Sequence, residues 1–228
     1  MKIPGTPSGL IAVRDAIFEA IPVNITMLFS TEQYLAAASA YMSGIEARLE
    51  RGFHPVVHSV ASISVSSWDV AVRDHVPAAL HNQLGLAMAH HIYIAYRAML
   101  VSPRWKKLES AGAVHQRLLW ASISTTDPLA PDTVYLDALA ASDTIMLTGE
   151  MMLQAFIDHG RLIDTMPADS AEADQIITQF VARGFNLRSL AIQLQHESSR
   201  TFTSSWYALM MVISRKIIQL PYAASIER

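Results

Sequence analysis

The stretch Val23-Asn24-Ile25-Thr26-Met27-Leu28-Phe29 decides the fold, because it has the pattern of a strand that leads directly into a helix. Its β-branched residues alternate with other side chains, as is typical of a strand. Ser30 or Thr31 can cap the following helix, which we expect to end near Arg51, before Gly52. A second strand is predicted at residues 58–65, so this part of the chain has the strand–helix–strand order of a parallel sheet.

The same order extends outward on both sides. A stub of strand at residues 1–3 and a helix at 8–21 precede the first strand. After the second strand we predict a helical stretch broken at Pro77, with helices at 78–100 and 103–112, then strands at 118–122 and 144–147. Helices follow at about 150–158, 170–183 and 187–217. A closed parallel barrel needs eight strands, so the sheet either stays open or is completed by another chain.

Composition excludes several classes of protein. The 228 residues are 51% hydrophobic and 16% charged, which excludes a disordered chain and favours a partner or an apolar ligand. The net charge of −3 argues against nucleic-acid binding, and no apolar stretch reaches the ~18 residues that cross a membrane. No cysteine occurs, which excludes disulfides, thiolate catalysis and cysteine-bound metals, and we expect a cytoplasmic protein.

Lys2 is the lysine best placed for catalysis. It precedes Ile-Pro-Gly-Thr, where a strand passes into a loop, and catalytic groups of parallel α/β folds gather at that edge. If apolar walls shelter its amine, desolvation makes it a nucleophile that can form a Schiff base with a carbonyl compound. A solvated lysine without a catalytic role is the alternative interpretation.

Polar side chains alternate on several of the predicted strands. Asn24 and Thr26 project to one side of their strand, where they could orient a ligand or a water molecule. Small hydroxyl side chains repeat in the same way on two later strands: Ser62, Ser64 and Ser66, then Ser122 and Ser124. Such residues either line a pocket with hydrogen-bond donors, with Trp120 as a further wall, or serve tight packing.

The nine histidines suggest no metal site. His90 and His91 are adjacent and therefore lie on different faces of a helix, and Pro55 separates His54 from His58. Neither a Gly-x-Ser-x-Gly elbow nor a glycine-rich nucleotide loop occurs. We therefore expect no metal and no cofactor.

Motifs spread over nearly the whole chain, taken in order, carry a family resemblance: Lys2-Ile3-Pro4-Gly5-Thr6, Val23-Asn24-Ile25-Thr26-Met27-Leu28-Phe29-Ser30, Ser59-Val60-Ala61-Ser62, Ser102-Pro103-Arg104-Trp105, Leu119-Trp120-Ala121-Ser122 and Phe156-Ile157-Asp158-His159-Gly160. They resemble the transaldolases. The resemblance implies one domain over residues 1–228, an α/β fold of the incomplete TIM (β/α)8 barrel type. About five parallel strands, from the fourth strand onward, would be surrounded by helices.

The resemblance also implies aldolase chemistry of the Schiff-base type. The family's imine-forming lysine falls on Lys2, and the residues that position the carbinolamine and the catalytic water fall on Asn24 and Thr26. The family's serine on the next strand falls on Ser62. The first three βα units of the family, which carry an Asp and a Glu for proton transfer, have no counterpart in this chain.

Two departures from the family concern substrate phosphate. The place of an arginine holds Ser67, and a turn that carries a lysine in the family reads Ser124-Thr125-Thr126-Asp127-Pro128. Each lost cation is worth roughly 1.5–3 kcal/mol as a charge-assisted hydrogen bond, so the two together amount to about 10²-fold or more in affinity. We therefore predict a small-molecule carbonyl substrate without phosphate, more apolar than a sugar phosphate and typical of specialised metabolism. Its candidate contacts are Ser62, Ser64, Ser67, Trp120, Ser122 and Ser124.

Three alternatives stay open: a cyclase or condensing enzyme that does not use the lysine, a non-catalytic scaffold or interaction subunit, and an ordinary sugar-phosphate transaldolase if the chain is a fragment. An open sheet exposes unpaired backbone and an apolar face, so we predict a homodimer or larger oligomer that covers residues 1–6 or the inner face. The helix at 187–217 is expected to cover its own sheet, with contact to a partner as the alternative.

Overall fold

The computed structural model describes residues 1–162, 165–167 and 169–219. Five parallel strands form one sheet in the order of the sequence, which confirms the predicted fold class: β1 (Lys2–Pro4), β2 (Val23–Leu28), β3 (Ser59–Ser64), β4 (Arg117–Ala121) and β5 (Thr144–Met146). Within the described residues β1 and β5 are the two edges of this sheet, so it does not close into a barrel.

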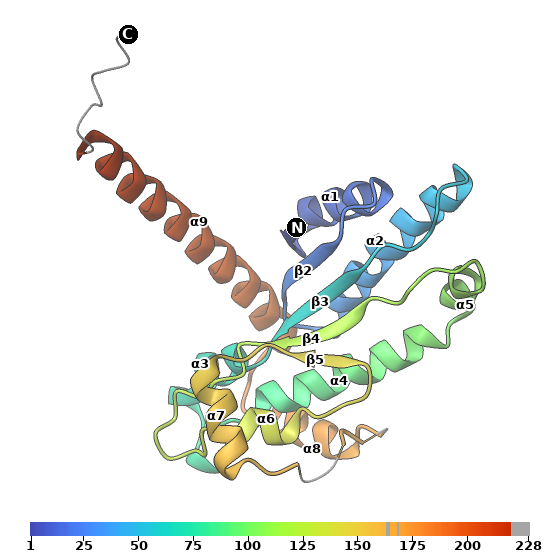
Figure 1. The fold of residues 1–228 in the computed structure, drawn as a ribbon. Coiled ribbons are helices and arrows are strands. Elements are labelled where there is room, and N and C mark those ends of the chain that lie inside the picture. The colour runs from blue at the N-terminus through green and yellow to red at the C-terminus, as the bar shows by residue number, and fades with distance from the viewer. Residues whose placement is uncertain (163–164, 168, 220–228) are drawn as a thin grey trace.

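Helices alternate with these strands (Figure 1): α1 (Pro7–Phe18), α2 (Thr31–Glu50), α3 (Ser66–Val72), α4 (Leu84–Leu100), α5 (Pro103–Ser110), α6 (Val134–Ala138), α7 (Glu150–His159), α8 (Ala171–Ala182) and α9 (Leu187–Gln219). Two short 3-10 turns, η1 (Arg73–His75) and η2 (Ala78–Leu80), separate α3 from α4. The helix predicted at residues 78–100 therefore begins later, at Leu84. Asn82, with a φ of 59°, interrupts it, because left-handed backbone cannot continue an α-helix. The short α6 was not predicted.

Side-chain caps mark the starts of α1 and α2. The Thr6 hydroxyl accepts a hydrogen bond from the backbone N–H of Gly9 at the start of α1. At the start of α2, Ser30 and Gln33 form a reciprocal capping box, as the serine before that helix led us to expect. Such caps satisfy backbone N–H groups that have no partner inside the helix. They also fix the points at which the chain passes from β1 into α1 and from β2 into α2.

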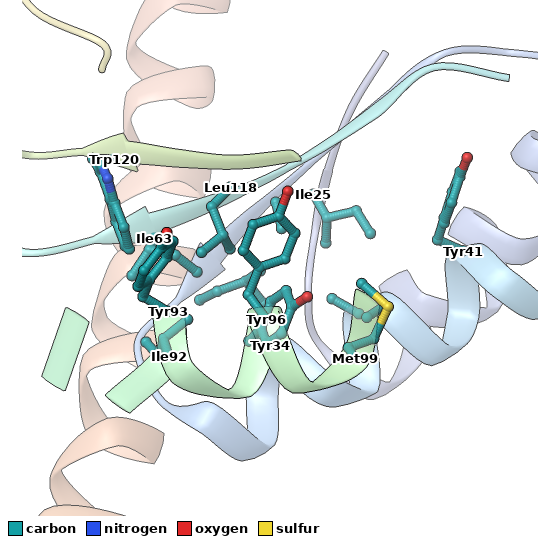
Figure 2. Packing of buried hydrophobic residues seen from close by; sticks show 14 of the residues in the cluster. Ile25, Tyr34, Tyr41, Ile63, Ile92, Tyr93, Tyr96, Met99, Leu118 and Trp120 are labelled. Carbon is teal, nitrogen blue, oxygen red and sulfur yellow. The ribbon is translucent and has the colours of Figure 1, made fainter. Parts of the chain in front are cut away.

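One face of the sheet is fully covered by helices. Ile25, Ile63, Leu118 and Trp120 are at most 1% exposed and pack toward α2 and α4 (Figure 2). Aromatic side chains from these two helices, among them Tyr34 and Tyr96, fill the space beneath the strands. This layer is the main hydrophobic core, and it holds the strands in register.

The opposite face of the sheet, here called the open face, is formed by side chains that share one side of their strands: Lys2, Asn24, Thr26, Val60, Ser62, Ser64, Arg117, Leu119 and Ala121. Lys2 and Arg117 are exposed and most of the others are half-buried, although Ser62 and Leu119 are buried. No described helix covers this face in the way that α2 and α4 cover the other. Polar groups therefore line what would be the interior of a closed barrel.

The long helix α9 is anchored at the carboxyl ends of β1 and β2 and then leaves the rest of the chain (Figure 1). Its first part carries Ala191 and Leu194, which are buried. From Arg200 to Ile217 every side chain except that of Met210 is exposed. The expectation that this helix covers its own sheet therefore holds only for its first turns.

Among the described residues, no single helix has both the length and the apolar character that a membrane span requires. One bent pair, residues 78–100 with α5, meets the criteria of length and composition.

Candidate functional site

Lys2 and Asn24 lie side by side on the open face. They are register partners in the pairing of β1 with β2, so both side chains project to the same side. Lys2 is exposed, whereas Asn24 is half-buried. The expectation that Lys2 is sheltered from solvent is therefore wrong for this chain by itself, because no described segment lies over the open face beside β1.

A hydrogen bond joins Asn24 to the next strand. The Ser62 hydroxyl donates to Oδ1 of Asn24 at 2.7 Å, and Ser62 is only 2% exposed. Oδ1 is thus occupied, and the amide Nδ2 makes no hydrogen bond among the described residues. Asn24 is therefore held in one orientation with a donor available for a ligand oxygen.

Thr26 and Ser64 complete the polar part of the open face. Thr26 is the register partner of Pro4, and Ser64 pairs with Ala121 on β4. Both are half-buried. The structure therefore brings Lys2, Asn24, Thr26, Ser62 and Ser64 onto one surface.

A cavity of about 610 Å³ lies at the carboxyl ends of the strands, between the sheet and α9. Ser67 at the start of α3 and Ser122 just after β4 contribute to its wall, while Glu197 and Phe202 contribute from α9. An adjoining cavity of about 350 Å³ contains Ser122 and Ser124. Neither Lys2 nor Asn24 lines these cavities, so the residues predicted from the sequence fall into two neighbouring groups rather than one pocket.

The larger cavity has few charged walls. Glu197 is its one ionisable lining residue within the described part of the chain, and its Oε1 accepts a hydrogen bond from Gln193. Its described lining residues include no lysine or arginine. This lining is unfavourable for a dianionic group such as phosphate.

Ser122 and Ser124 are not strand residues, although the predicted strand extended to 122. β4 ends at Ala121, and Ser122 has a φ of 51°, which turns the backbone away from the ladder. Both serines are exposed in the loop after β4. They reach the cavities because the chain turns at this point.

Trp120 is not a wall of the site, and its prediction as a substrate contact is wrong. It is fully buried on the helix-covered face and lies in register with Ile63, on the opposite side from Ser62 and Leu119 (Figure 2). Because side chains alternate across a strand, Trp120 cannot reach a ligand on the open face.

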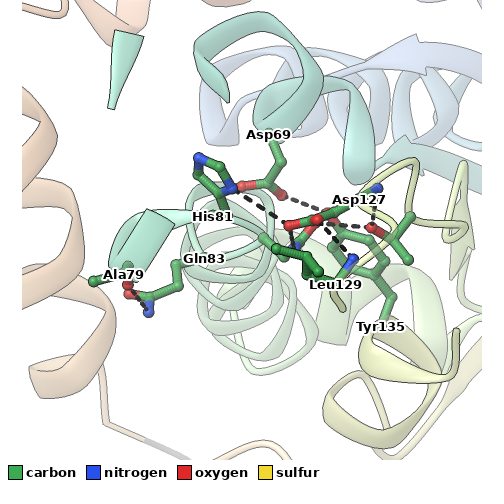
Figure 3. Close-up of polar contacts among 9 residues, drawn as sticks. Asp69, Ala79, His81, Gln83, Asp127, Leu129 and Tyr135 are labelled. Carbon is green, nitrogen blue, oxygen red and sulfur yellow. Dashed lines mark hydrogen bonds and ion pairs between the residues drawn. The ribbon is translucent and has the colours of Figure 1, made fainter. Parts of the chain in front are cut away.

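A buried polar cluster that the sequence did not suggest holds the segments around the cavities (Figure 3). Asp69 accepts hydrogen bonds from the backbone N–H groups of Leu84 and Gly85 and from the Tyr135 hydroxyl at 2.8 Å. Only glycine fits at position 85, since a Cβ there would lie 2.5 Å from Oδ2 of Asp69. Burial raises the pKa of Asp69 to about 6, although the hydrogen bond from Tyr135 acts in the opposite direction.

The same cluster reaches the loop after β4. Asn82 donates to Asp127 and accepts from the Thr125 hydroxyl, and His81 contacts the same Asp127 carboxylate at 3.3 Å. Hydrogen bonding to the backbone N–H of Leu129 and to His81 lowers the pKa of Asp127. The loop that contains the two exposed serines is therefore tied to the start of α4.

Comparison with known proteins agrees with this geometry. The family model for Transaldolase/Fructose-6-phosphate aldolase matches residues 1–213. The chain belongs to this family. It is 35% identical over 226 residues to a transaldolase of Frankia alni, 33% identical over 211 residues to one of Neisseria meningitidis serogroup A, and 35% identical over 220 residues to one of Arthrobacter sp..

These matches cover 95%, 92% and 92% of this chain but only 61%, 60% and 59% of the respective transaldolases. The chain thus spans about three-fifths of the length of its curated relatives. Its five parallel strands are likewise about three-fifths of the eight strands of a closed barrel. Both observations agree with a truncated barrel of the transaldolase type.

Proposed function

We propose that this chain supplies the imine-forming part of an aldolase-type site, with Lys2 as the nucleophile. The observation that carries the proposal is the arrangement of the open face. The Lys2 side chain shares a register position with Asn24, whose amide is oriented by the buried Ser62 hydroxyl. Membership of the transaldolase family supports the same chemistry.

The proposed reaction begins when the Lys2 amine adds to the carbonyl carbon of a ketose. The C–N bond forms, the carbonyl oxygen takes a proton, and loss of water from the carbinolamine gives a protonated imine. This cation accepts the electron pair of the bond between the α and β carbons when that bond breaks. The β-hydroxyl gives its proton to water, and the products are an enamine and an aldehyde. In the reverse direction the enamine carbon attacks an acceptor aldehyde, and water then hydrolyses the imine to free Lys2.

Asn24 and Thr26 have positioning roles in this proposal. The Nδ2 group of Asn24 donates to the hydroxyl of the carbinolamine, and the half-buried Thr26 hydroxyl orients the water that leaves and returns. Ser62 acts on Asn24 rather than on the substrate, because its hydroxyl is already committed to Oδ1. Ser64 offers a further donor on the same face.

We further propose that the substrate carries no phosphate group. The cavity beside the open face is lined by hydroxyls, apolar side chains and Glu197, without a lysine or arginine among its described lining residues. Charge-assisted hydrogen bonds are worth roughly 1.5–3 kcal/mol each, so a lining without cations favours a neutral hydroxyketone over its phosphate ester.

The two alternatives to an imine mechanism make predictions that differ from those of the imine mechanism. A non-catalytic scaffold predicts a filled space at the strand ends, and the cavity of about 610 Å³ argues against it. A cyclase or condensing enzyme that works by shape and hydrogen bonds predicts that Lys2→Ala keeps full activity. The exposure of Lys2 in the chain by itself is the observation that keeps this second function in consideration.

Borohydride trapping tests the proposal. The protein is incubated with fructose or with fructose 6-phosphate, which differ only in the phosphate, and reduced with borohydride before its intact mass is measured. We expect an adduct that disappears in Lys2→Ala and persists in Lys107→Ala, an exposed lysine on α5 that serves as the matched control. The absence of any adduct on Lys2 with either sugar would overturn the imine mechanism. A larger yield with fructose 6-phosphate would overturn only the substrate assignment and favour an ordinary sugar-phosphate transaldolase.

A further inference from the structure

One hydroxyl hydrogen in the buried polar cluster faces two acceptors (Figure 3). The Tyr135 hydroxyl oxygen lies 2.8 Å from Oδ2 of Asp69 and 3.3 Å from Oδ1 of Asn82, and all three residues are buried. A phenol has a single hydrogen to donate, so it satisfies one of these oxygens at a time. The shorter distance assigns the hydrogen to Asp69. The Tyr135 oxygen and Oδ1 of Asn82 then face each other without a hydrogen between them.

Asn82 connects this hydroxyl to the loop after β4. Its Nδ2 donates to Oδ2 of Asp127 at 3.2 Å, and a carboxylate has only acceptors to offer. Oδ1 is therefore the Asn82 atom that faces Tyr135, and the Thr125 hydroxyl donates to the same Oδ1 at 3.0 Å. Any change in the hydrogen bond between Tyr135 and Asn82 thus acts on an amide that holds two residues of the loop.

The groups around Asp69 let it titrate near neutral pH. Burial raises the pKa of Asp69 to about 6, while the hydrogen bond from Tyr135 on α6 and the charge of Arg73 on η1 act in the opposite direction. Burial and the Asp69 carboxylate raise the pKa of Tyr135, so the phenol keeps its hydrogen throughout this range. Asp127 and His81 are the other ionisable members of the cluster among the described residues, and they contact each other at 3.3 Å.

Protonation of Asp69 reverses the direction of its hydrogen bond to Tyr135. When Oδ2 takes a proton from solvent, the new O–H donates to the Tyr135 oxygen, and the Tyr135 hydrogen turns to Oδ1 of Asn82. The backbone N–H groups of Leu84 and Gly85 keep their acceptors on Asp69 in both states. The cluster therefore has two discrete hydrogen-bond arrangements that differ by one proton.

Both ends of this path lie next to residues that line the two cavities. Asp69 is on α3, two residues after Ser67, which lines the larger cavity. Thr125 directly follows Ser124, which lines the smaller cavity, and Ser122 in the same loop lines both. A change of hydrogen bonding in the cluster therefore reaches the walls of the cavities through the backbone of this loop.

We propose that Tyr135 is a positioning residue, whose hydroxyl passes the proton state of Asp69 to the loop after β4 and so determines how firmly the cavity walls are held. With Asp69 protonated, Tyr135 and Thr125 both hold Asn82, and the loop is ordered. With Asp69 ionised, the bond from Tyr135 to Asn82 is lost and the loop loosens. The inference rests on the proposed function for its effect on substrate, whereas the effect on the loop needs no ligand.

Two backbone amides report on the two ends of the path in NMR spectra recorded between pH 5 and 7. The N–H of Gly85 donates to Oδ2 of Asp69 at 3.0 Å, and the N–H of Asp127 donates to the Thr125 hydroxyl at 3.0 Å. All proteins carry His81→Asn, because the imidazole contacts Asp127 and would add a pH dependence of its own. We expect both amide shifts to change with pH and to share one midpoint.

Tyr135→Phe removes the hydroxyl and keeps the ring. The Gly85 amide should still titrate, at higher pH, because the lost hydrogen bond favoured the ionised carboxylate, whereas the Asp127 amide should stop following it. Tyr96→Phe is the matched control. It removes another buried hydroxyl, which donates to the backbone carbonyl of Asp143 at 3.2 Å outside the cluster, and it should leave both titration curves unchanged.

Thr125→Val breaks the same path at its other end and keeps the proposal testable if Tyr135→Phe does not fold. Thr125 is half-buried and valine has nearly the same shape. The Gly85 amide should keep its titration, and the Asp127 amide should again lose it.

The borohydride assay tests the effect on substrate. From pH 7 to pH 5 the half-saturating concentration of fructose should decrease by roughly threefold more in the protein with Tyr135 than in Tyr135→Phe, because one hydrogen bond that orders the loop is gained only there. The maximal yield of adduct should be the same in both proteins at each pH. Such a split separates positioning of the cavity walls from a general loss of structure.

Three results would overturn the proposal. One is an Asp127 amide that still follows the Gly85 amide in Tyr135→Phe or in Thr125→Val. Another is an equal effect of Tyr96→Phe and Tyr135→Phe, which would assign the change to a general loosening of the fold. The third is an equal pH dependence of the half-saturating concentration with and without the Tyr135 hydroxyl. The absence of any adduct on Lys2 would instead refute the imine mechanism, and the amide shifts would still decide the effect on the loop.

Discussion

Lowering the pH from 7 to 5 should make this fold more stable through Asp69. The carboxylate is 3% exposed and receives three hydrogen bonds from neutral donors, yet its pKa is raised from 3.8 to about 6, chiefly by burial. A group whose pKa is higher in the folded state binds its proton more tightly there. Protonation between these two values therefore favours folding, and the ionised carboxylate opposes folding above pH 6.

The magnitude follows from linkage. A difference between about 6 and 3.8 corresponds to roughly 3 kcal/mol when the pH is above both values. Between pH 7 and pH 5 the folded state takes up most of a proton while the unfolded state takes up little. The free energy of unfolding should therefore increase by roughly 1 kcal/mol over this interval from Asp69 alone.

Urea unfolding at several pH values between 5 and 7 measures this effect, with Asp69→Asn as the reference. Groups other than Asp69 contribute equally to the pH dependence of stability in both proteins. The difference between the two profiles therefore isolates the contribution of the Asp69 carboxyl. Tyr135→Phe removes a donor that favours the ionised form, and it should move the increase in stability to higher pH. A difference profile that is flat, or that decreases toward pH 5, would refute the burial argument.

Three further predictions concern packing and the site. Gly44→Ala should destabilise the fold by about 1–3 kcal/mol in thermal or urea unfolding, although alanine has the better helix propensity, because the new Cβ would lie 2.7 Å from atoms of Ile17. An increase in stability would contradict the packing of α1 on α2. Ser62→Ala should reduce the yield of the borohydride-trapped adduct, because Asn24 loses the donor that orients it, while the secondary structure measured by circular dichroism stays intact. An unchanged yield of adduct would count against the orienting role of Ser62. Ser67→Arg should lower the half-saturating concentration of fructose 6-phosphate by about tenfold or more and change that of fructose by less than about twofold. Equal effects on both sugars would contradict the argument that the missing cations disfavour a phosphate group.

Local sequence signals predicted most of the fold. The strand at residues 23–29 and the helix from Thr31 agree with the structure within one or two residues, because β-branched alternation and the Ser30 cap act through neighbouring residues. The start of α4 was placed too early because the left-handed backbone of Asn82 depends on contacts with a distant loop. The start of α4 thus depends on residues that are far apart in the sequence.

The site was only partly predictable for the same reason. Alternation placed Asn24 and Thr26 correctly on one side of β2. The run Leu118-Leu119-Trp120 is apolar throughout, so its pattern did not indicate which side Trp120 occupies. The exposure of Lys2 depends on what covers the open face, and the sequence around Lys2 contains no information about that.

The most direct test of the central claim is the yield of reduced adduct at Lys2, mapped by peptide mass spectrometry with fructose as substrate, in the chain and in its Asn24→Ala variant. We predict an adduct confined to Lys2, with a yield lowered by roughly tenfold or more in Asn24→Ala, because the amide beside Lys2 that holds the carbinolamine is then missing. An equal yield in both proteins, or an adduct shared among the exposed lysines, would contradict the claim that Lys2 and Asn24 form one imine-forming site.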